Sequence, residues 1–267
     1  MTALDDLRAA GDPALAAEAA TRHQADREYL GTPLTEIDAL VAGWRAELSV
    51  EERVALASSL WSTNVHEARI AAARLLLQAR MRPDEAAWRL VQDWLPDLDA
   101  WSIADAVSKA AEKRVTSDLS RLDVVEGWLA HENAWVRRAA LLATAPLSKL
   151  NNPKPEELDA REQVLDWIAD LLPDRDWHVQ KAIAAWLRDL TKHDPARVDS
   201  FLAEHAEQAF EHHPGRGDLR LGEAHDPAIG RDGNRGGTGV LDRVGHGEHV
   251  VGVDRDLAAE GHGAVVG

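Results

Sequence analysis

Apolar residues recur at three- and four-residue intervals along roughly residues 1–212, the spacing that is typical of amphipathic helices. No alternating apolar and polar run predicts a strand in this stretch. Asp12-Pro13 predicts a helix that continues to about Glu28, and Thr32 is expected to cap the next helix. Further helix starts are expected near Ser49, Asn64, Arg82-Pro83, Pro96-Asp97, Ser117, Glu132-Asn133, Pro155, Asp174 and His193-Asp194-Pro195. The pattern therefore predicts about ten helices joined by short polar loops.

Some of these helical segments resemble one another. AWVRRAALLATAPL begins at Ala134 and WHVQKAIAAWLRDL begins at Trp177, and alignment of Val136 with Val179 gives a spacing of 43 residues. A looser relative, HEARIAAARLLLQ, begins at His66. A period near 40–47 residues built from helix pairs is the signature of HEAT-type repeats. We therefore expect an all-α, HEAT-like helical-repeat solenoid with a concave face, and the alternative is an irregular helical bundle.

Composition divides the chain near residue 212. All ten Trp lie between Trp44 and Trp186, whereas 14 of the 18 Gly follow residue 213. The segment 213–267 has no Trp, Phe, Tyr or Lys and cannot bury enough apolar surface to offset its ordering entropy. We predict a HEAT-like domain over 1–212 and a disordered tail over 213–267. The abrupt change also suggests the hypothesis that the tail is an out-of-frame reading of GC-rich DNA.

Charge and cysteine content exclude several classes of protein. The 267 residues include no cysteine, which excludes disulfides, thiolate zinc sites and a cysteine nucleophile. Lys and Arg total 30 against 46 Asp and Glu, and the net charge of −16 argues against a uniformly basic nucleic-acid-binding surface. No run of 18 apolar residues predicts a membrane span and the acidic N-terminus is not a secretory signal, so we expect a cytoplasmic protein.

Metal and cofactor motifs are incomplete. His66-Glu67 begins like the zinc-protease motif HExxH, but position 70 is Ile, so the second histidine ligand is missing. The tail glycines include no phosphate-binding loop with a GK[ST] sequence. We therefore expect neither a bound metal nor a cofactor.

The segment LPDLDAWSIADAVSKAAEKR carries the first candidate site. Trp101 and Asp105 are four residues apart and share a helix face, which Ser108 and Glu112 are expected to continue as a polar face. An aromatic ring one turn from a carboxylate suits a cationic substrate, because both groups attract positive charge. The alternative is a tryptophan at the rim of a groove beside a solvated aspartate.

Basic residues recur at related repeat positions. Arg137 and Arg138 lie in one repeat, and Lys181 and Arg188 lie in the next. If these four side chains line one surface of a solenoid, they could bind a phosphate backbone despite the negative total charge, because the local field decides such binding. The alternative is ordinary solvated helix charges.

Taken together, these segments resemble the AlkD-type DNA alkylation-repair family, the alkylpurine DNA glycosylases with HEAT-like repeats. The resemblance covers roughly residues 20–205. It rests on five segments in order: YLGTP at 29–33, similar to an FxG-type turn; SSLWSTNVHEARIAAARLLLQ at 58–78, similar to LWxSxxHExRxxAxxLL; DAWSIADAVS, similar to the WDxxD helix; ENAWVRRAALL, similar to WxxRxA; and HVQKAIAAWLRDLTKHDP, similar to QKAIxWxLRxxxKxxP.

The resemblance implies an enzyme that hydrolyses the N-glycosidic bond of cationic N-alkylated purines of the 3-methyl or 7-methyl type in DNA. It places the catalytic carboxylate on Asp105 and the tryptophan that contacts the lesion on Trp101. It also places DNA-contacting arginines on Arg138 and Arg188. Double-stranded DNA with alkylated bases would be the partner, bound by a monomer without a metal.

The chain departs from the family pattern at three points. The family's second tryptophan falls on Ala185, because Trp186 is one position further along the helix and is rotated by about 100°. This rotation places Trp186 on the packing side of the helix, so we expect it to be buried. The acid after the first tryptophan is Ser102, and residues 1–212 carry 24 basic against 37 acidic side chains. The alternative function is therefore a non-catalytic HEAT-repeat module that binds DNA structure or a protein partner. A repeat scaffold without a role on nucleic acid is a third possibility.

Overall fold

The computed structural model describes residues 2–206, and its regular elements within that range are all helical. The helices are α1 (Ala3–Ala9), α2 (Pro13–His23), α3 (Leu34–Glu47), α4 (Val50–Ser62), α5 (His66–Leu75), α6 (Glu85–Trp94), α7 (Trp101–Ser117), α8 (Leu122–Glu126), α9 (Ala134–Ala143), α10 (Pro155–Leu171), α11 (Trp177–Thr191) and α12 (Pro195–Glu204). Three short 3₁₀ helices join them, namely η1 (Leu95–Asp97), η2 (Leu119–Arg121) and η3 (Ala145–Lys149). The predictions for segment 213–267 lie outside the described residues.

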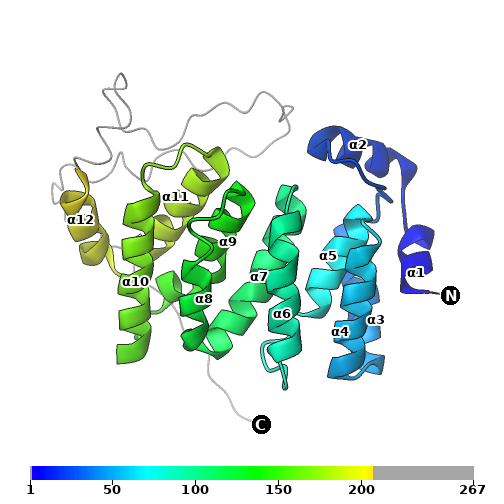
Figure 1. Cartoon of the computed structure of the whole chain (residues 1–267), viewed down its shortest axis with the longest axis horizontal. Helices are drawn as coiled ribbons and strands as arrows, with labels where there is room; N and C mark the ends of the chain where they lie inside the picture. The colour runs from blue at the N-terminus through cyan, green and yellow to red at the C-terminus, as the bar shows by residue number, and fades with distance from the viewer. Residues whose placement is uncertain (1, 207–267) are drawn as a thin grey trace, which may run out of the picture.

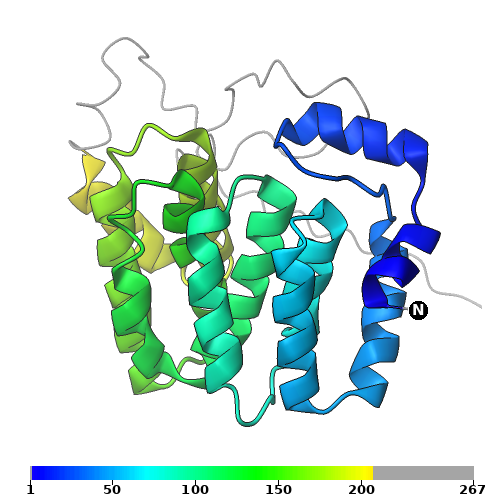
Figure 2. The same ribbon diagram turned by 45° about the vertical axis from the view of Figure 1, so that its right-hand side comes forward.

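The helices stack in pairs into a solenoid. Within the row, α3, α5, α7, α9 and α11 each pack on the next, and α4, α6 and α10 pack on the helix that follows them in the chain. Figures 1 and 2 show this row of nearly parallel helices, with α2 turned across one end of it. The predicted all-α, HEAT-like solenoid is confirmed. No helix in the described part of the chain is both long and apolar enough to cross a membrane.

Local capping chemistry sets many of the helix starts that the sequence predicted. The Ser49 hydroxyl accepts from the backbone of Glu52, whose carboxylate accepts from the Ser49 N–H, so a capping box opens α4. Asp12, Asn133 and Asp176 accept from first-turn amides of α2, α9 and α11. These bonds satisfy amides that would otherwise lack a partner at the helix ends.

The N-terminal region differs from the prediction in three respects. Helix α1 was not predicted, and α2 ends at His23 rather than near Glu28, because Gln24 adopts a left-handed backbone with φ 54°. Thr32 does not cap α3; the N-cap is Pro33, and the Thr32 hydroxyl donates to the Leu7 carbonyl at 2.9 Å. Thr32 thus ties the turn to α1, a long-range contact that no local pattern could predict.

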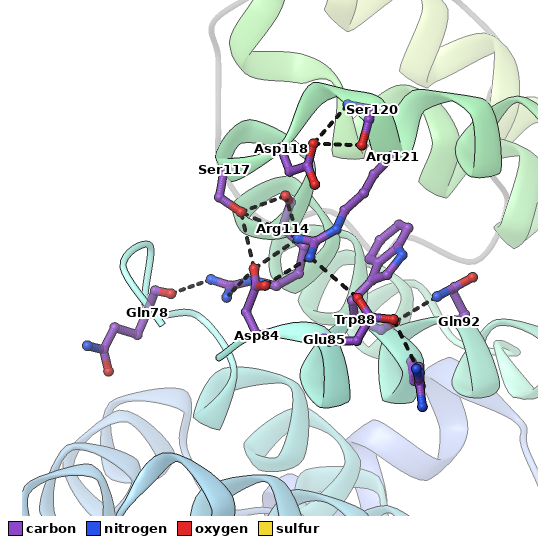
Figure 3. Close-up of polar contacts among 11 residues, drawn as sticks. Gln78, Asp84, Glu85, Trp88, Gln92, Arg114, Ser117, Asp118, Ser120 and Arg121 are labelled. Atoms are coloured by element: carbon purple, nitrogen blue, oxygen red, sulfur yellow. Dashed lines mark hydrogen bonds and ion pairs between the residues drawn. The ribbon is translucent and has the colours of Figure 1, made fainter. Parts of the chain in front are cut away.

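An ion-pair network anchors α6 to the end of α7 (Figure 3). Asp84 accepts from Arg121 at 2.9 Å on each carboxylate oxygen, from Arg114 at 3.2 Å and from the Ser117 hydroxyl at 3.2 Å. The Arg114 side chain is 0% exposed, and its guanidinium also donates to the Gln78 carbonyl. The Arg121 guanidinium lies over the Trp88 ring, 5.3 Å from its centroid. Two nearly buried cations therefore depend on one carboxylate.

Candidate functional site

An exposed carboxylate on α7 is held by an arginine from α9. The Asp105 side chain is 43% exposed, whereas that of Arg138 is 11% exposed. Arg138 donates to Asp105 Oδ1 from Nη2 at 2.9 Å and from Nε at 3.3 Å, and its Nη1 donates to the His178 carbonyl at 3.0 Å. Among the described residues none donates to Asp105 Oδ2. One carboxylate oxygen is thus fixed by Arg138, while the other accepts no hydrogen bond from the described part of the chain.

Trp101 stands one helical turn before Asp105, as their four-residue spacing predicted. It is the first residue of α7 and is 45% exposed, which is unusual for so large an apolar side chain. Helix α7 begins without a side-chain cap. The exposed ring and the exposed carboxylate therefore share the start of one helix.

The prediction that a polar face continues beyond Asp105 is wrong at Ser108 and Glu112. Ser108 and Glu112 are buried, at 1% and 6% exposed. The Ser108 hydroxyl donates to the Ala104 carbonyl at 2.6 Å, and Glu112 accepts from Lys109 and Lys113. Packing of α7 against α5 and α9 covers these two positions, so the exposed polar side of the helix does not continue through them.

Behind Trp101 lies a cluster of rings that the sequence did not reveal. His23, at the end of α2, has its ring centroid 5.6 Å from that of Trp101 and 4.5 Å from that of His66. The Tyr29 ring lies 4.9 Å from His66. The Ser102 hydroxyl is 2.9 Å from His66 Nε2 and 3.4 Å from His23 Nε2. These residues come from α2, the following turn, α5 and α7, so no local spacing could have found the cluster.

The YLGTP turn and the HExR segment are joined directly. The Glu67 carboxylate accepts from the backbone N–H groups of Leu30 and Gly31 at 2.8 and 2.9 Å. Gly31 has φ 70°, and a Cβ there would lie only 2.0 Å from the Asp12 carbonyl oxygen, so the turn requires glycine. The His66-Glu67 pair therefore positions the turn that carries Tyr29. No cluster of potential metal ligands occurs among the described residues.

His66 is held in the neutral form by its surroundings. Burial, helped by the positive charges of Arg27 and Arg69 and by His23, lowers the pKa of His66 to about 3. Burial and the nearby Arg22 and Arg27 also lower the pKa of His23. Both imidazoles near Trp101 are therefore uncharged at neutral pH, and they do not repel a cation at the exposed ring.

We expect acidification from about pH 7.5 to about pH 5 to lower the free energy of unfolding by about 2 kcal/mol through His66. The folded pKa, about 3, lies below the ordinary value of 6.5, so the unfolded chain binds the proton more readily. The stabilisation is complete above pH 6.5 and falls by about 1.4 kcal/mol per pH unit until the folded pKa is reached. Urea unfolding at several pH values measures this slope.

The matched comparison for this slope is His66→Gln against His193→Gln, since His193 is a partly exposed histidine outside the cluster. We expect His66→Gln to reduce the slope between pH 6.5 and 5, leaving the part that His23 contributes through its own lowered pKa, and His193→Gln to keep the slope unchanged. The pKa values of Asp84, Asp174 and Asp189 are lowered below 3.8, so loss of their stabilisation belongs to a more acidic range. An unchanged slope in His66→Gln would contradict the assignment.

The four basic residues that the sequence singled out lie in different settings. Arg138 is engaged with Asp105, and Arg137 donates to Asp174 at 2.7 Å and to the His131 and Glu132 carbonyls. Lys181 and Arg188 are exposed on α11, and the Lys181 ammonium lies 6.0 Å from the centroid of the Trp177 ring. Lys181 and Arg188 are thus the members of the set that are most open to solvent.

Helix α11 carries one buried and one exposed tryptophan, and the sequence predicted only the buried one. Trp186 is 2% exposed and belongs to the core, and Ala185 takes the half-exposed position beside it. Trp177, which the sequence did not single out, is the first residue of α11 and is 40% exposed. It precedes His178, whose carbonyl accepts from Arg138 and whose ring lies 4.1 Å from that of Trp135. Exposed tryptophans therefore begin both α7 and α11.

Comparison with known proteins gives a family match and a set of structural relatives. A family model described as "DNA alkylation repair enzyme" matches residues 3–212. The solved structure described as "Predicted DNA alkylation repair enzyme from Enterococcus faecalis" is 21% identical, with a TM-score of 0.61 over 78% of this chain and 98% of that one. AlkD2 from Streptococcus mutans is 20% identical, with a TM-score of 0.53 over 67% of this chain and 87% of that one. At such identities the structures show a shared fold. No curated protein sequence matches the chain significantly.

Proposed function

The chain belongs to the DNA alkylation repair enzyme family, and from this premise we propose that it is a DNA glycosylase that releases cationic N-alkylated purines from duplex DNA. The observation that carries the proposal is the exposed Asp105 carboxylate, fixed on one oxygen by Arg138 and one turn from the exposed Trp101 ring. A cationic lesion fits this pair because both groups attract positive charge.

The chemistry needs only one acid. Alkylation at N3 or N7 makes the purine cationic, so the base leaves as a neutral molecule without being protonated. As the N-glycosidic bond breaks, the sugar acquires oxocarbenium character, and the Asp105 carboxylate stabilises that charge or orients the attacking water. Water adds to C1′ and releases a proton, which leaves an abasic site. Trp101 contributes about 0.5–2 kcal/mol of cation–π attraction to the charged lesion.

The remaining residues are assigned supporting roles. Arg138 positions Asp105, because its guanidinium is already committed to that carboxylate and to the His178 carbonyl. Lys181 and Arg188 are exposed on the neighbouring helix and would hold phosphates without reading sequence. We propose this positioning role for Arg138 in place of the DNA contact that the resemblance implies, whereas the DNA contact of Arg137 stays a prediction from the sequence.

The test is release of free base from methylated duplex DNA by the purified chain, followed by chromatography. The proposal requires release of 3-methyl or 7-methyl purine faster than from DNA alone. Duplex binding without release would favour the second candidate, a non-catalytic module that binds DNA structure. That candidate is favoured by Ala185, which leaves the site without the family's second tryptophan.

Arg138→Ala is expected to lower the rate of base release about 100-fold, because a carboxylate displaced by about 1 Å loses this much rate. Its effect on affinity for unmodified duplex should be small. The measurements are single-turnover release and fluorescence anisotropy with labelled duplex at several salt concentrations.

Arg188→Ala is the matched control, because it removes an exposed arginine of the adjacent helix. For Arg188→Ala we expect weaker binding to any duplex, and the slope of log binding constant against log salt concentration should be smaller in magnitude by about one. The rate of base release at saturating DNA should be retained. Equal effects of the two changes on release would contradict the separate roles.

A further inference from the structure

A groove lies in the N-terminal part of the solenoid, between α1, α3 and α4, and contains none of the residues assigned to DNA. Its volume is about 680 Å³. Its apolar lining includes Leu40, Trp44 and Leu56, all of which are partly exposed. A groove of this kind can take the apolar stripe of a helix.

The rim of the groove is acidic. Four carboxylates line it, namely Asp6, Glu36, Glu47 and Glu52, and none of its lining residues is basic. Glu52 is engaged with the Ser49 backbone. Within residues 2–206 the other three form no ion pair, whereas other carboxylates of the same region do, such as Glu28 with Arg8 and Asp38 with Arg74. The rim therefore attracts cationic side chains and repels a phosphate backbone.

Gly43 marks the point where a second backbone could come close. It lies in the middle of α3 and lines the groove, and a Cβ added there would meet nothing within 4 Å. The fold does not require glycine at this position, yet glycine inside a helix costs about 1 kcal/mol relative to alanine. Close approach of a partner would account for it.

We propose that this groove docks an amphipathic helix of a partner protein, with an apolar stripe seated on Leu40, Trp44 and Leu56 and Lys or Arg on both flanks. Charge complementarity favours this occupant, because the rim carboxylates attract cations and the apolar lining accepts apolar side chains. The proposal is independent of the glycosylase function, since α1, α3 and α4 carry none of that site's residues.

The test uses a labelled synthetic peptide of about 18 residues, five helical turns, made of leucine, alanine and lysine with leucines along one face. Fluorescence anisotropy with the full chain should give saturable binding that weakens as salt rises. A peptide of the same composition in scrambled order, without the apolar stripe, should bind at least tenfold more weakly, on the order of the 1.4 kcal/mol that a tenfold change represents.

Two pairs of variants locate the binding. The double variant Glu36→Lys, Glu47→Lys should weaken binding of the peptide about tenfold or more. The control is the double variant Glu51→Lys, Asp123→Lys, which makes the same change in charge at exposed sites outside the groove. It should leave the affinity for the peptide within about twofold. Gly43→Leu should also weaken binding by filling the groove, while Ala46→Leu, on the same helix but outside the groove, should not.

Three results would overturn the proposal: no binding of the striped peptide, equal binding of the scrambled peptide, or equal losses in the control variants. Dimerisation of the chain that disappears in the Glu36→Lys and Glu47→Lys variant would assign the groove to a second copy and would also overturn it. Base release from methylated DNA should be unchanged in all four variants, so failure of docking and failure of the glycosylase proposal are distinguishable.

Discussion

Replacing Asp105 by asparagine is expected to lower the release of methylated purine by at least about 100-fold, which corresponds to about 2.7 kcal/mol of transition-state stabilisation. The amide keeps the shape of the side chain and can still accept from Arg138, but it carries no negative charge to oppose the developing oxocarbenium ion. Affinity for unmodified duplex should be retained, because the substitution removes no cation.

Single-turnover release from methylated duplex, with anisotropy on the same duplex, separates the two effects. Asp123→Asn is the matched control, because it makes the same chemical change at an exposed aspartate of α8, away from the site. The control should release base at the unmodified rate. A release rate that survives in Asp105→Asn would remove Asp105 from the reaction.

The largest loss of stability is expected from Asp84→Ala, about 3–5 kcal/mol in the free energy of unfolding. The substitution leaves Arg114, which is 0% exposed, and Arg121, which is 10% exposed, without their shared carboxylate. Each guanidinium would then be a nearly buried charge with lost hydrogen bonds. Urea unfolding of both proteins at neutral pH measures the difference.

The adjacent Glu85 provides the control for Asp84. Figure 3 includes Glu85 among the residues around Asp84. Its carboxylate lies 3.8 Å from Arg121 but its side chain is 58% exposed, so Glu85→Ala should cost less than about 1 kcal/mol. The hydrogen bond from Arg121 is the main cause of the lowered pKa of Asp84. The stabilisation by Asp84 is therefore present above about pH 3.8 and is lost as the pH falls through the folded pKa. Comparable losses in the two variants would contradict a special role for Asp84.

The sequence by itself determined the helices and one part of the site. Apolar spacing of three and four residues fixes a helical face, and Ser49, Asn133 and Pro155 mark helix starts, because capping depends on neighbours within one turn. The pairing of Trp101 with Asp105 on one face follows from the helical repeat alone. The burial of Trp186, one position beyond Ala185, follows from the same geometry and is confirmed.

Only the tertiary structure decided which distant groups meet. Arg138 binds Asp105 although the two residues are 33 positions apart in the chain. The His23 ring lies against that of Trp101, and His23 is 79 positions before Ser102, which it also contacts. The tertiary structure also buried Ser108 and Glu112, which the helical period placed on a polar face, because neighbouring helices cover that side of α7. The helical period fixes the direction of a side chain relative to its own axis, whereas the packing of one repeat on the next fixes what that side chain meets.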